Sequence, residues 1–243
     1  MSDTLQKYIE LNWQRRAEIR NIIFQRTKGI VYQGPFKGLK ILPKWTWGDG
    51  DCIGKLLGIY ECELYQYIEE SINRNPDLIL NIGSAEGYYG LGLSKRTNIP
   101  TVLFDINPNA LNIARETAKE NNIHNVQFNT DCNPEEYQRY LEKAQRPFIV
   151  MDIEGAEDDI LDLKVMPDLV KADIIVECHD CNKEGISLRL IEKFQATHWI
   201  KIIPQGAKNP YMEITDDFND YDKMIMCCEA RPRTMTWMYM VPK

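Results

Sequence analysis

Two short stretches in the second half of the chain combine carboxylates with an imidazole, the side chains most used for acid–base and metal chemistry. Asp152-Ile153-Glu154-Gly155-Ala156-Glu157 follows one apolar run, and Glu177-Cys178-His179-Asp180 follows the next. Oxygen and imidazole ligands suit a divalent ion such as magnesium or manganese, which lowers the pKa of a bound hydroxyl. The candidate metal ligands are Asp152, Glu177 and Asp180.

The same residues also support acid–base chemistry without a metal. The ordinary pKa of histidine is about 6.5, so the neutral ring of His179 can remove a hydroxyl proton while Asp180 or Glu177 orients it. Asp152 ends an apolar run and is expected to face the same crevice, whereas Glu157 is expected to stabilise the start of a helix. The candidate catalytic residues are His179, Asp152 and Asp180. A histidine that only satisfies neighbouring strand ends is the alternative.

A glycine-rich turn lies earlier in the chain, where Asn81 to Gly90 follows an apolar run. Gly83 and Gly87 lack a Cβ, so the backbone there can turn sharply and approach a ligand. Ala85 occupies the place of the second glycine of a dinucleotide fingerprint, which disfavours a pyrophosphate. Asp105 ends the next apolar run, about 20 residues further on, where an acceptor for ribose hydroxyls is expected. The pattern favours an adenosyl ligand without pyrophosphate over a turn that merely packs.

The elements that position these residues form an alternating pattern after residue 76. Apolar runs alternate with amphipathic segments, which predicts an α/β fold with a mostly parallel sheet and helices on both faces. Ligands of such sheets bind outside the carboxyl ends of the strands, where the strand order reverses. The predicted strands lie near 77–82, 101–105, 125–129, 147–152, 173–178, 199–203 and 235–241. The predicted helices between them lie near 87–97, 108–122, 134–145, 155–163 and 185–197.

The amino-terminal part has a different character. Leu5 to Gln25 predicts an amphipathic helix that caps the core, and Tyr60 to Ile72 predicts another. Between them, Lys28 to Gly58 is rich in glycine and proline and carries Trp45 and Trp47, which either cover a substrate or pack against the core. We divide the chain into a cap, 1–58, and a core domain, 59–243. Acceptor specificity is expected in 28–58 and in 205–226, which is also loop-rich.

Composition narrows the possible partners. The 243 residues are 44% hydrophobic, enough for one sizeable domain, and carry a net charge of -7. An acidic chain argues against a nucleic-acid partner, and Arg15, Arg16 and Arg20 are interpreted as a solvated helix face. No apolar stretch is long enough to cross a bilayer and Met1 to Gln14 lacks signal-peptide features, so no membrane partner and a cytoplasmic location are expected. The seven cysteines are expected to be reduced thiols. A small-molecule substrate and a homodimer are the remaining expected partners.

Four stretches give the chain a resemblance to a known family. Leu57 to Glu61, Asn81 to Tyr89, Asp152 to Glu157 and Val176 to Asp180 resemble an FkbM-like member of the class I S-adenosylmethionine-dependent methyltransferases. The match runs from about Gly34 to the carboxyl terminus. It implies a Rossmann-like, seven-stranded sheet with one antiparallel strand and O-methylation of a small metabolite or sugar. An N-methyltransferase and a non-catalytic adenosyl-binding protein are the alternatives, and Ala85 disfavours a nicotinamide dehydrogenase.

The resemblance also implies which residues hold S-adenosylmethionine. Ribose binding falls to Asp105 and adenine contacts fall near Asp131 and Cys132. The full expected set is Asn81, Gly83, Ser84, Glu86, Gly87, Tyr88, Asp105, Ile106, Asn107, Asp131, Cys132 and Asp152. Many family members begin the turn with Asp where this chain has Asn81. A similarity to catechol-type methyltransferases, with acids at adjacent strand ends, suggests a metal at Asp152.

Overall fold

Seven strands form one sheet in the order β3-β2-β1-β4-β5-β7-β6. The computed structural model describes residues 2–49, 51–231 and 233–243, so that Met1, Gly50 and Pro232 lie outside the described residues. The strands are β1 Leu78–Ile82, β2 Thr101–Phe104, β3 Val126–Asn129, β4 Pro147–Met151, β5 Asp173–Cys178, β6 His198–Pro204 and β7 Thr236–Pro242. β1 to β5 pair in parallel, and β7 runs antiparallel between β5 and β6. The mostly parallel sheet with one antiparallel strand is confirmed.

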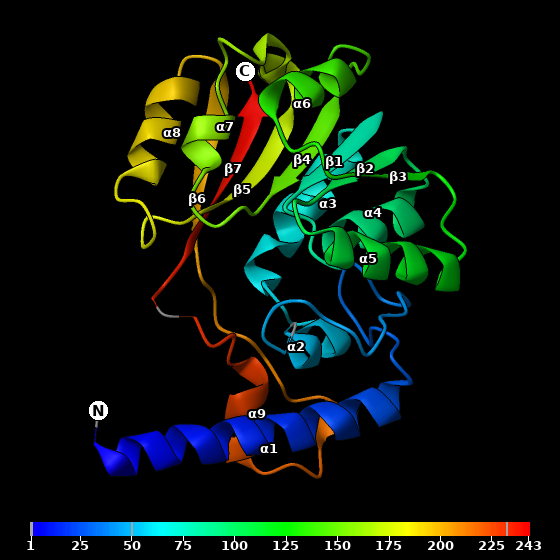
Figure 1. Cartoon of the computed structure of the whole chain (residues 1–243), viewed down its shortest axis with the longest axis vertical. Helices are drawn as coiled ribbons and strands as arrows, with labels where there is room; N and C mark the ends of the chain where they lie inside the picture. The colour runs from blue at the N-terminus through cyan, green and yellow to red at the C-terminus, as the bar shows by residue number, and fades with distance from the viewer. Residues whose placement is uncertain (1, 50, 232) are drawn as a thin grey trace.

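Helices cover both faces of this sheet (Figure 1). One face carries α3 Tyr65–Asn73, α4 Tyr88–Thr97 and α5 Pro108–Glu120, and the other carries α6 Pro134–Leu141, α7 Glu157–Ile160 and α8 Ile186–Phe194. Side chains alternate along each strand: Ile149 of β4 packs on the α6 and α8 side, and Phe148 and Val150 pack on the other side. Each such buried side chain contributes about 1.5–3 kcal/mol, so the central strands are mainly apolar.

Local sequence explains where the helices begin. α5 and α6 each start at an Asn-Pro pair, in which the Asn107 or Asn133 side chain accepts a backbone N–H of the first turn. The helix predicted near 155–163 is wrong at both ends, because α7 spans only Glu157–Ile160. Glu154 and Gly155 have positive φ angles of 61° and 119°, which an α-helix does not accommodate.

A cap of helices lies beside the sheet and contains segments from the amino-terminal and the carboxyl-terminal parts of the chain (Figure 1). α1 Asp3–Thr27 packs against α2 Cys52–Leu57 and α9 Asp220–Cys227, and their shared apolar core includes Ile19, Leu56 and Met226. Two short 3₁₀ segments, η1 Cys62–Leu64 and η3 Glu213–Thr215, adjoin it, and a third, η2 Pro167–Lys171, precedes β5. α2 lies in 28–58 and most of α9 in 205–226, and outside the short helical segments both ranges are loop-rich, as predicted. The division at residue 58 stays a prediction.

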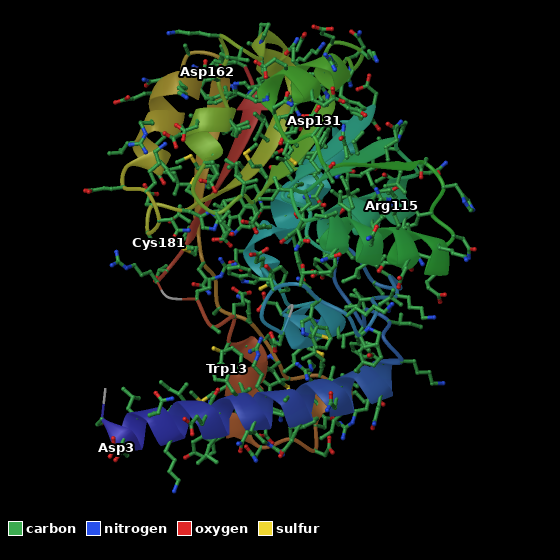
Figure 2. All side chains as sticks on the ribbon, in the orientation of Figure 1. Asp3, Trp13, Arg115, Asp131, Asp162 and Cys181 are labelled. Carbon is green, nitrogen blue, oxygen red and sulfur yellow. The ribbon has the colours of Figure 1, made fainter. Side chains whose placement is uncertain are left out.

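Arg16 holds the cap together. Its guanidinium donates to Asp49 at 2.5 Å and to the carbonyl of Cys228, and the residue is only 3% exposed. The interpretation of this arginine cluster as a solvated face was therefore wrong for Arg16. Trp13, labelled in Figure 2, extends from α1 on the side where α9 lies. Trp45 is half-buried with Arg20 over its ring at 4.6 Å, which supports packing rather than a mobile cover.

The cap faces the carboxyl ends of the parallel strands. Cys178 at the end of β5 pairs with Thr236 at the start of β7, and β7 begins on the side of the sheet where α2 and α9 lie (Figure 1). Among the described residues, no helix combines the length and the apolar character needed to cross a membrane. The seven cysteines are free thiols, as expected.

Candidate active site

The glycine-rich turn after β1 lies between the ends of β2 and β4, the two strands that flank β1 in the sheet. Gly83 has a φ of 74°, and a Cβ there would lie 1.7 Å from the carbonyl oxygen of Asp152. The backbone N–H groups of Gly83 and Ser84 both donate to the carbonyl of Phe104 at 2.9 Å. Gly87, with a φ of 87°, precedes α4. The turn therefore needs glycine at position 83 because the β4 turn approaches it directly.

Asp105 joins the end of β2 to the glycine-rich turn. One carboxylate oxygen accepts the Ala85 N–H at 2.7 Å, and the other accepts the Asn107 N–H at 2.8 Å. Ala85 has a φ of 44°, and this left-handed backbone conformation directs its N–H toward Asp105. Each carboxylate oxygen can accept a second hydrogen bond, which leaves two acceptor positions for a diol. The neighbouring Ile106 is 82% exposed.

Three predicted cofactor residues use their side chains within the protein. Asn81 accepts the Gly90 N–H at 2.9 Å and donates to the Val150 carbonyl at 3.3 Å, so its amide holds α4 against the sheet. Glu86 accepts the Thr46 hydroxyl at 2.7 Å and so ties the cap to the turn. Tyr88 is buried in an aromatic cluster with Phe36 and Tyr60. Their cofactor contacts stay predictions. Asp131 and half-buried Cys132 follow β3, beside the end of β2.

His179 lies at the centre of the acidic residues that follow β4 and β5. Its Nδ1 lies 2.6 Å from Oε1 of Glu157, which also accepts the Gly155 N–H at 3.0 Å. Its Nε2 lies 3.6 Å from Asp152 Oδ1, 3.4 Å from Glu154 Oε2 and 3.6 Å from Glu177 Oε2. Glu157, which is completely buried, lies in the first turn of α7 as expected and also orients the ring.

The predicted metal set differs from the set that the structure assembles. Asp152, Glu154 and His179 each place one ligand atom within 4.8 Å of the others. Asp180 instead accepts the backbone N–H of Ser187 at 3.2 Å and also the Ser187 hydroxyl, so it holds the first turn of α8. Asp180 therefore neither orients His179 nor joins the metal set, contrary to prediction. Cys181, labelled in Figure 2, follows at the same end of β5.

Burial shifts the proton affinities in this cluster. Burial alone would lower the pKa of His179, but the bond to Glu157 and the nearby Asp152 outweigh it and raise the pKa. Burial raises the pKa of Asp152 to about 6, and the His179 charge partly opposes that rise. Burial and the neighbouring Asp152 also raise the pKa of Glu177. Imidazole and carboxylates thus compete for protons near neutral pH, as acid–base groups do.

A largely buried arginine, Arg231, which the sequence analysis did not identify, neutralises the adjoining carboxylates. The guanidinium of Arg231 donates to Glu177, to Glu61 and, at 2.8 Å, to Glu229. The hydroxyl of Tyr89 also donates to Glu61. Glu177 is therefore held in an ion pair, which removes it from the predicted ligand set. Arg231 lies 54 residues from Glu177 and 170 from Glu61, so no local pattern connects them.

Two surface hollows lie away from this cluster. Ser94, Asn121 and Asn125 line one, and Asp77 and Tyr140 line the other. Both hollows are at the amino ends of the strands. Open α/β sheets bind ligands at the opposite ends, so we assign these hollows no role.

Comparisons with known proteins show the fold. No protein-family model matches the chain, and no curated protein matches it. An rRNA methylase from Streptococcus thermophilus superposes with a TM-score of 0.50 at 12% identity, covering 74% of this chain and 96% of its own. An O-methyltransferase from Bacillus cereus in complex with SAH (TM-score 0.49, 15% identity, 73% and 80% covered) is also similar. A precorrin-6y C5,15-methyltransferase from Geobacter metallireducens is similar as well, with a TM-score of 0.49 and 13% identity, covering 72% of this chain and 87% of its own.

The strand order and the rRNA methylase likeness together define the fold class. The chain has the Rossmann-like fold of class I methyltransferases, as predicted. An identity of 12% shows the fold alone. Membership of the FkbM-like family stays a prediction.

Proposed function

We propose that this protein binds S-adenosylmethionine and transfers its methyl group to a hydroxyl of a small metabolite or sugar. The observation that carries the proposal is the Asp105 carboxylate, which is bonded to the Ala85 and Asn107 N–H groups beside the glycine-rich turn. An acid at the end of β2 beside such a turn suits a ribose diol.

The residues around the turn fit an adenosyl ligand. The buried hydroxyl oxygen of Ser84 has no hydrogen-bond partner among the described residues, and it lies one residue after Gly83. Asp105 would bind the ribose hydroxyls, and exposed Ile106 would offer an apolar surface to the adenine. Asp131 and Cys132, which follow β3, would lie next to it. When bound, the cofactor supplies a methyl group on a positively charged sulfonium, a good leaving group.

The acceptor would be held where the β4 and β5 turns meet the glycine-rich turn. The contact of Gly83 with the Asp152 carbonyl brings the acidic cluster against the cofactor turn. Asp152 and His179 would hold the acceptor hydroxyl and accept its proton, and Glu157 would keep the ring of His179 in place. Positioning and exclusion of water account for the rest of the rate enhancement in this proposal.

The test is isothermal titration with S-adenosylhomocysteine. We expect micromolar binding by the intact protein and a loss of about 100-fold in Asp105→Ala, because two hydrogen bonds to a charged group contribute about 3 kcal/mol. Asp77→Ala is a matched control: Asp77 also accepts two backbone N–H groups, from Gln145 at 2.7 Å and Arg146 at 2.9 Å, but at the amino end of β1. Absence of binding by the intact, folded protein would overturn the proposal. A screen of hydroxylated and amine acceptors then assigns the acceptor atom.

A further inference from the structure

We propose that Asp152, Glu154 and His179 bind one divalent metal ion and leave a coordination position open for an oxygen ligand. The ligand set combines two carboxylates with one imidazole, and it differs from the set that the sequence suggested. The binding of the ion stands on its own geometry. Its use, coordination of the acceptor oxygen, rests on the proposed methyl transfer. With the ion bound, Asp152 and His179 would hold the acceptor oxygen through the metal instead of accepting its proton, and the hydroxyl, whose pKa the ion lowers, would lose its proton to water.

The distances around Nε2 of His179 fit a shared ion. Asp152 Oδ1 and Glu154 Oε2 lie 3.6 and 3.4 Å from it, and the three ligand atoms lie within 4.8 Å of one another. Both contacts are longer than an ordinary N–H···O hydrogen bond. Ligands at about 2.1 Å from an ion at tetrahedral angles are separated by about 3.4 Å. One ion between these atoms therefore needs only small adjustments of the side chains.

The charge balance also favours a cation. Asp152, Glu154 and Glu157 have no lysine or arginine ion-pair partner among the described residues, and all three face His179. The adjoining Glu177 is paired with Arg231. Three carboxylates thus share one imidazole in a partly buried site, where unpaired charge is costly. With the ligating imidazole neutral, a divalent ion reduces the net charge of the three carboxylates from -3 to -1.

Unpartnered buried atoms point into the same place. His179 is only 1% exposed, and the one hydrogen bond that its ring makes to the described part of the chain is at Nδ1, so Nε2 is left facing the carboxylates. Oδ1 of Asp152 is a buried oxygen without a hydrogen-bond partner among the described residues. Buried polar atoms are usually satisfied, so an unpartnered Oδ1 that lies 3.6 Å from Nε2 of His179 indicates a missing ligand between them.

The surrounding residues already hold the ligands as in a metal site. Glu157 accepts from Nδ1 of His179, which directs Nε2 at the ion in the carboxylate–histidine–metal arrangement. Asn182 donates to the carbonyl of Glu154 at 3.1 Å and to its Oε2 at 3.3 Å. Glu154 has a φ of 61°, so its position depends on a strained turn.

The donor atoms select the kind of ion. Magnesium and calcium take oxygen ligands, whereas an imidazole beside carboxylates suits zinc or manganese(II). Three protein ligands with a fourth position open is the arrangement of catalytic rather than structural zinc sites. We therefore expect zinc and manganese(II) to bind more tightly than magnesium.

The experiment titrates the chelator-treated protein with Mn²⁺, followed by electron paramagnetic resonance, and with Zn²⁺, followed by calorimetry. We expect one ion per chain. Glu154→Gln, on a half-exposed side chain, and Asp152→Asn should each weaken Mn²⁺ binding at least 10-fold while the protein stays folded by circular dichroism. Asp159→Asn, a control on an exposed carboxylate of α7 paired with Lys183, should bind as the wild type does. No binding of either ion at millimolar concentration, or binding unchanged by both ligand variants, would overturn the proposal.

Glu157→Gln separates the positioning role from direct ligation. Loss of such a partner typically weakens metal affinity about 10- to 100-fold without changing the stoichiometry. An unchanged affinity would refute the positioning role. Binding of S-adenosylhomocysteine without any metal binding would sink this inference and leave the proposed function standing. Metal binding without S-adenosylhomocysteine binding would overturn the proposed function and leave the metal site standing.

Discussion

Replacing Gly83 by alanine tests whether the close approach of two strand-end turns builds the site. Two costs add in Gly83→Ala. A left-handed backbone at φ 74° costs a non-glycine residue about 1–2 kcal/mol. The added Cβ would lie 1.7 Å from the Asp152 carbonyl, so the β1 and β4 turns must separate. Overpacking of this kind costs about 1–3 kcal/mol. We expect a total loss of about 2–5 kcal/mol in the free energy of unfolding.

Gly38→Ala is the matched control. Its φ is 88°, but a Cβ there meets no atom within 4 Å, so only the backbone cost of about 1–2 kcal/mol applies. The difference between the two variants in the free energy of unfolding, measured in urea, gives the cost of the contact with the Asp152 carbonyl. Titration with S-adenosylhomocysteine should show at least a 10-fold weaker affinity for Gly83→Ala, because Asp152 moves with the turn, and an unchanged affinity for Gly38→Ala. Equal losses of stability in the two variants would refute the close-approach argument.

Three further predictions concern stability, pH and thiols. Arg231→Met should lower the free energy of unfolding by about 3–5 kcal/mol in urea, because it leaves buried carboxylates unpaired; a loss below 1 kcal/mol would contradict this. Burial lowers the pKa of His198 and the neighbouring carboxylates raise that of His179. With chelator present, the stability advantage of the wild type over His198→Gln should therefore shrink as the pH falls below about 6.5. Its advantage over His179→Gln should be largest below about 6.5 and should shrink as the pH rises through the higher native pKa of His179. Parallel pH profiles would exclude these signs. Burial raises the thiol pKa of Cys178 to about 12, so at pH 8 a disulfide reagent should label exposed Cys228 in the native protein and Cys178 only after unfolding. Rapid native labelling of Cys178 would show that the thiol is accessible.

Much of the sheet was predictable because its strands are buried on both faces. β4 is a continuous apolar run and β5 has the apolar centre Ile174-Ile175-Val176, as buried parallel strands require. The short helices α2 and α9 were missed. α2 has six residues, and α9 has eight and packs on α1, far away in the sequence. Helices of this length are stabilised by tertiary contacts more than by their own propensity.

Some residues of the candidate site could likewise be predicted from the sequence and others could not. Asp105, Asp152 and His179 follow apolar runs, so their place at the strand ends could be predicted from local sequence. The residue that orients the His179 ring could not be predicted, because Glu157 and Asp180 are both near His179 in the predicted topology. In the structure, the turn after β4 directs Glu157 toward His179, whereas Asp180 bonds to Ser187 at the start of α8.

The sequence by itself determined the alternation of strands and helices, the glycine-rich turn and the set of acids at the strand ends. These features depend on hydrophobic period and on local backbone freedom, which neighbours in the chain define. The tertiary structure alone decided that Arg231 pairs with Glu61 and Glu177, and that Asp152, Glu154 and His179 meet. Pairing between side chains depends on distances that arise when remote segments pack, and charge alone does not select among 36 acidic residues.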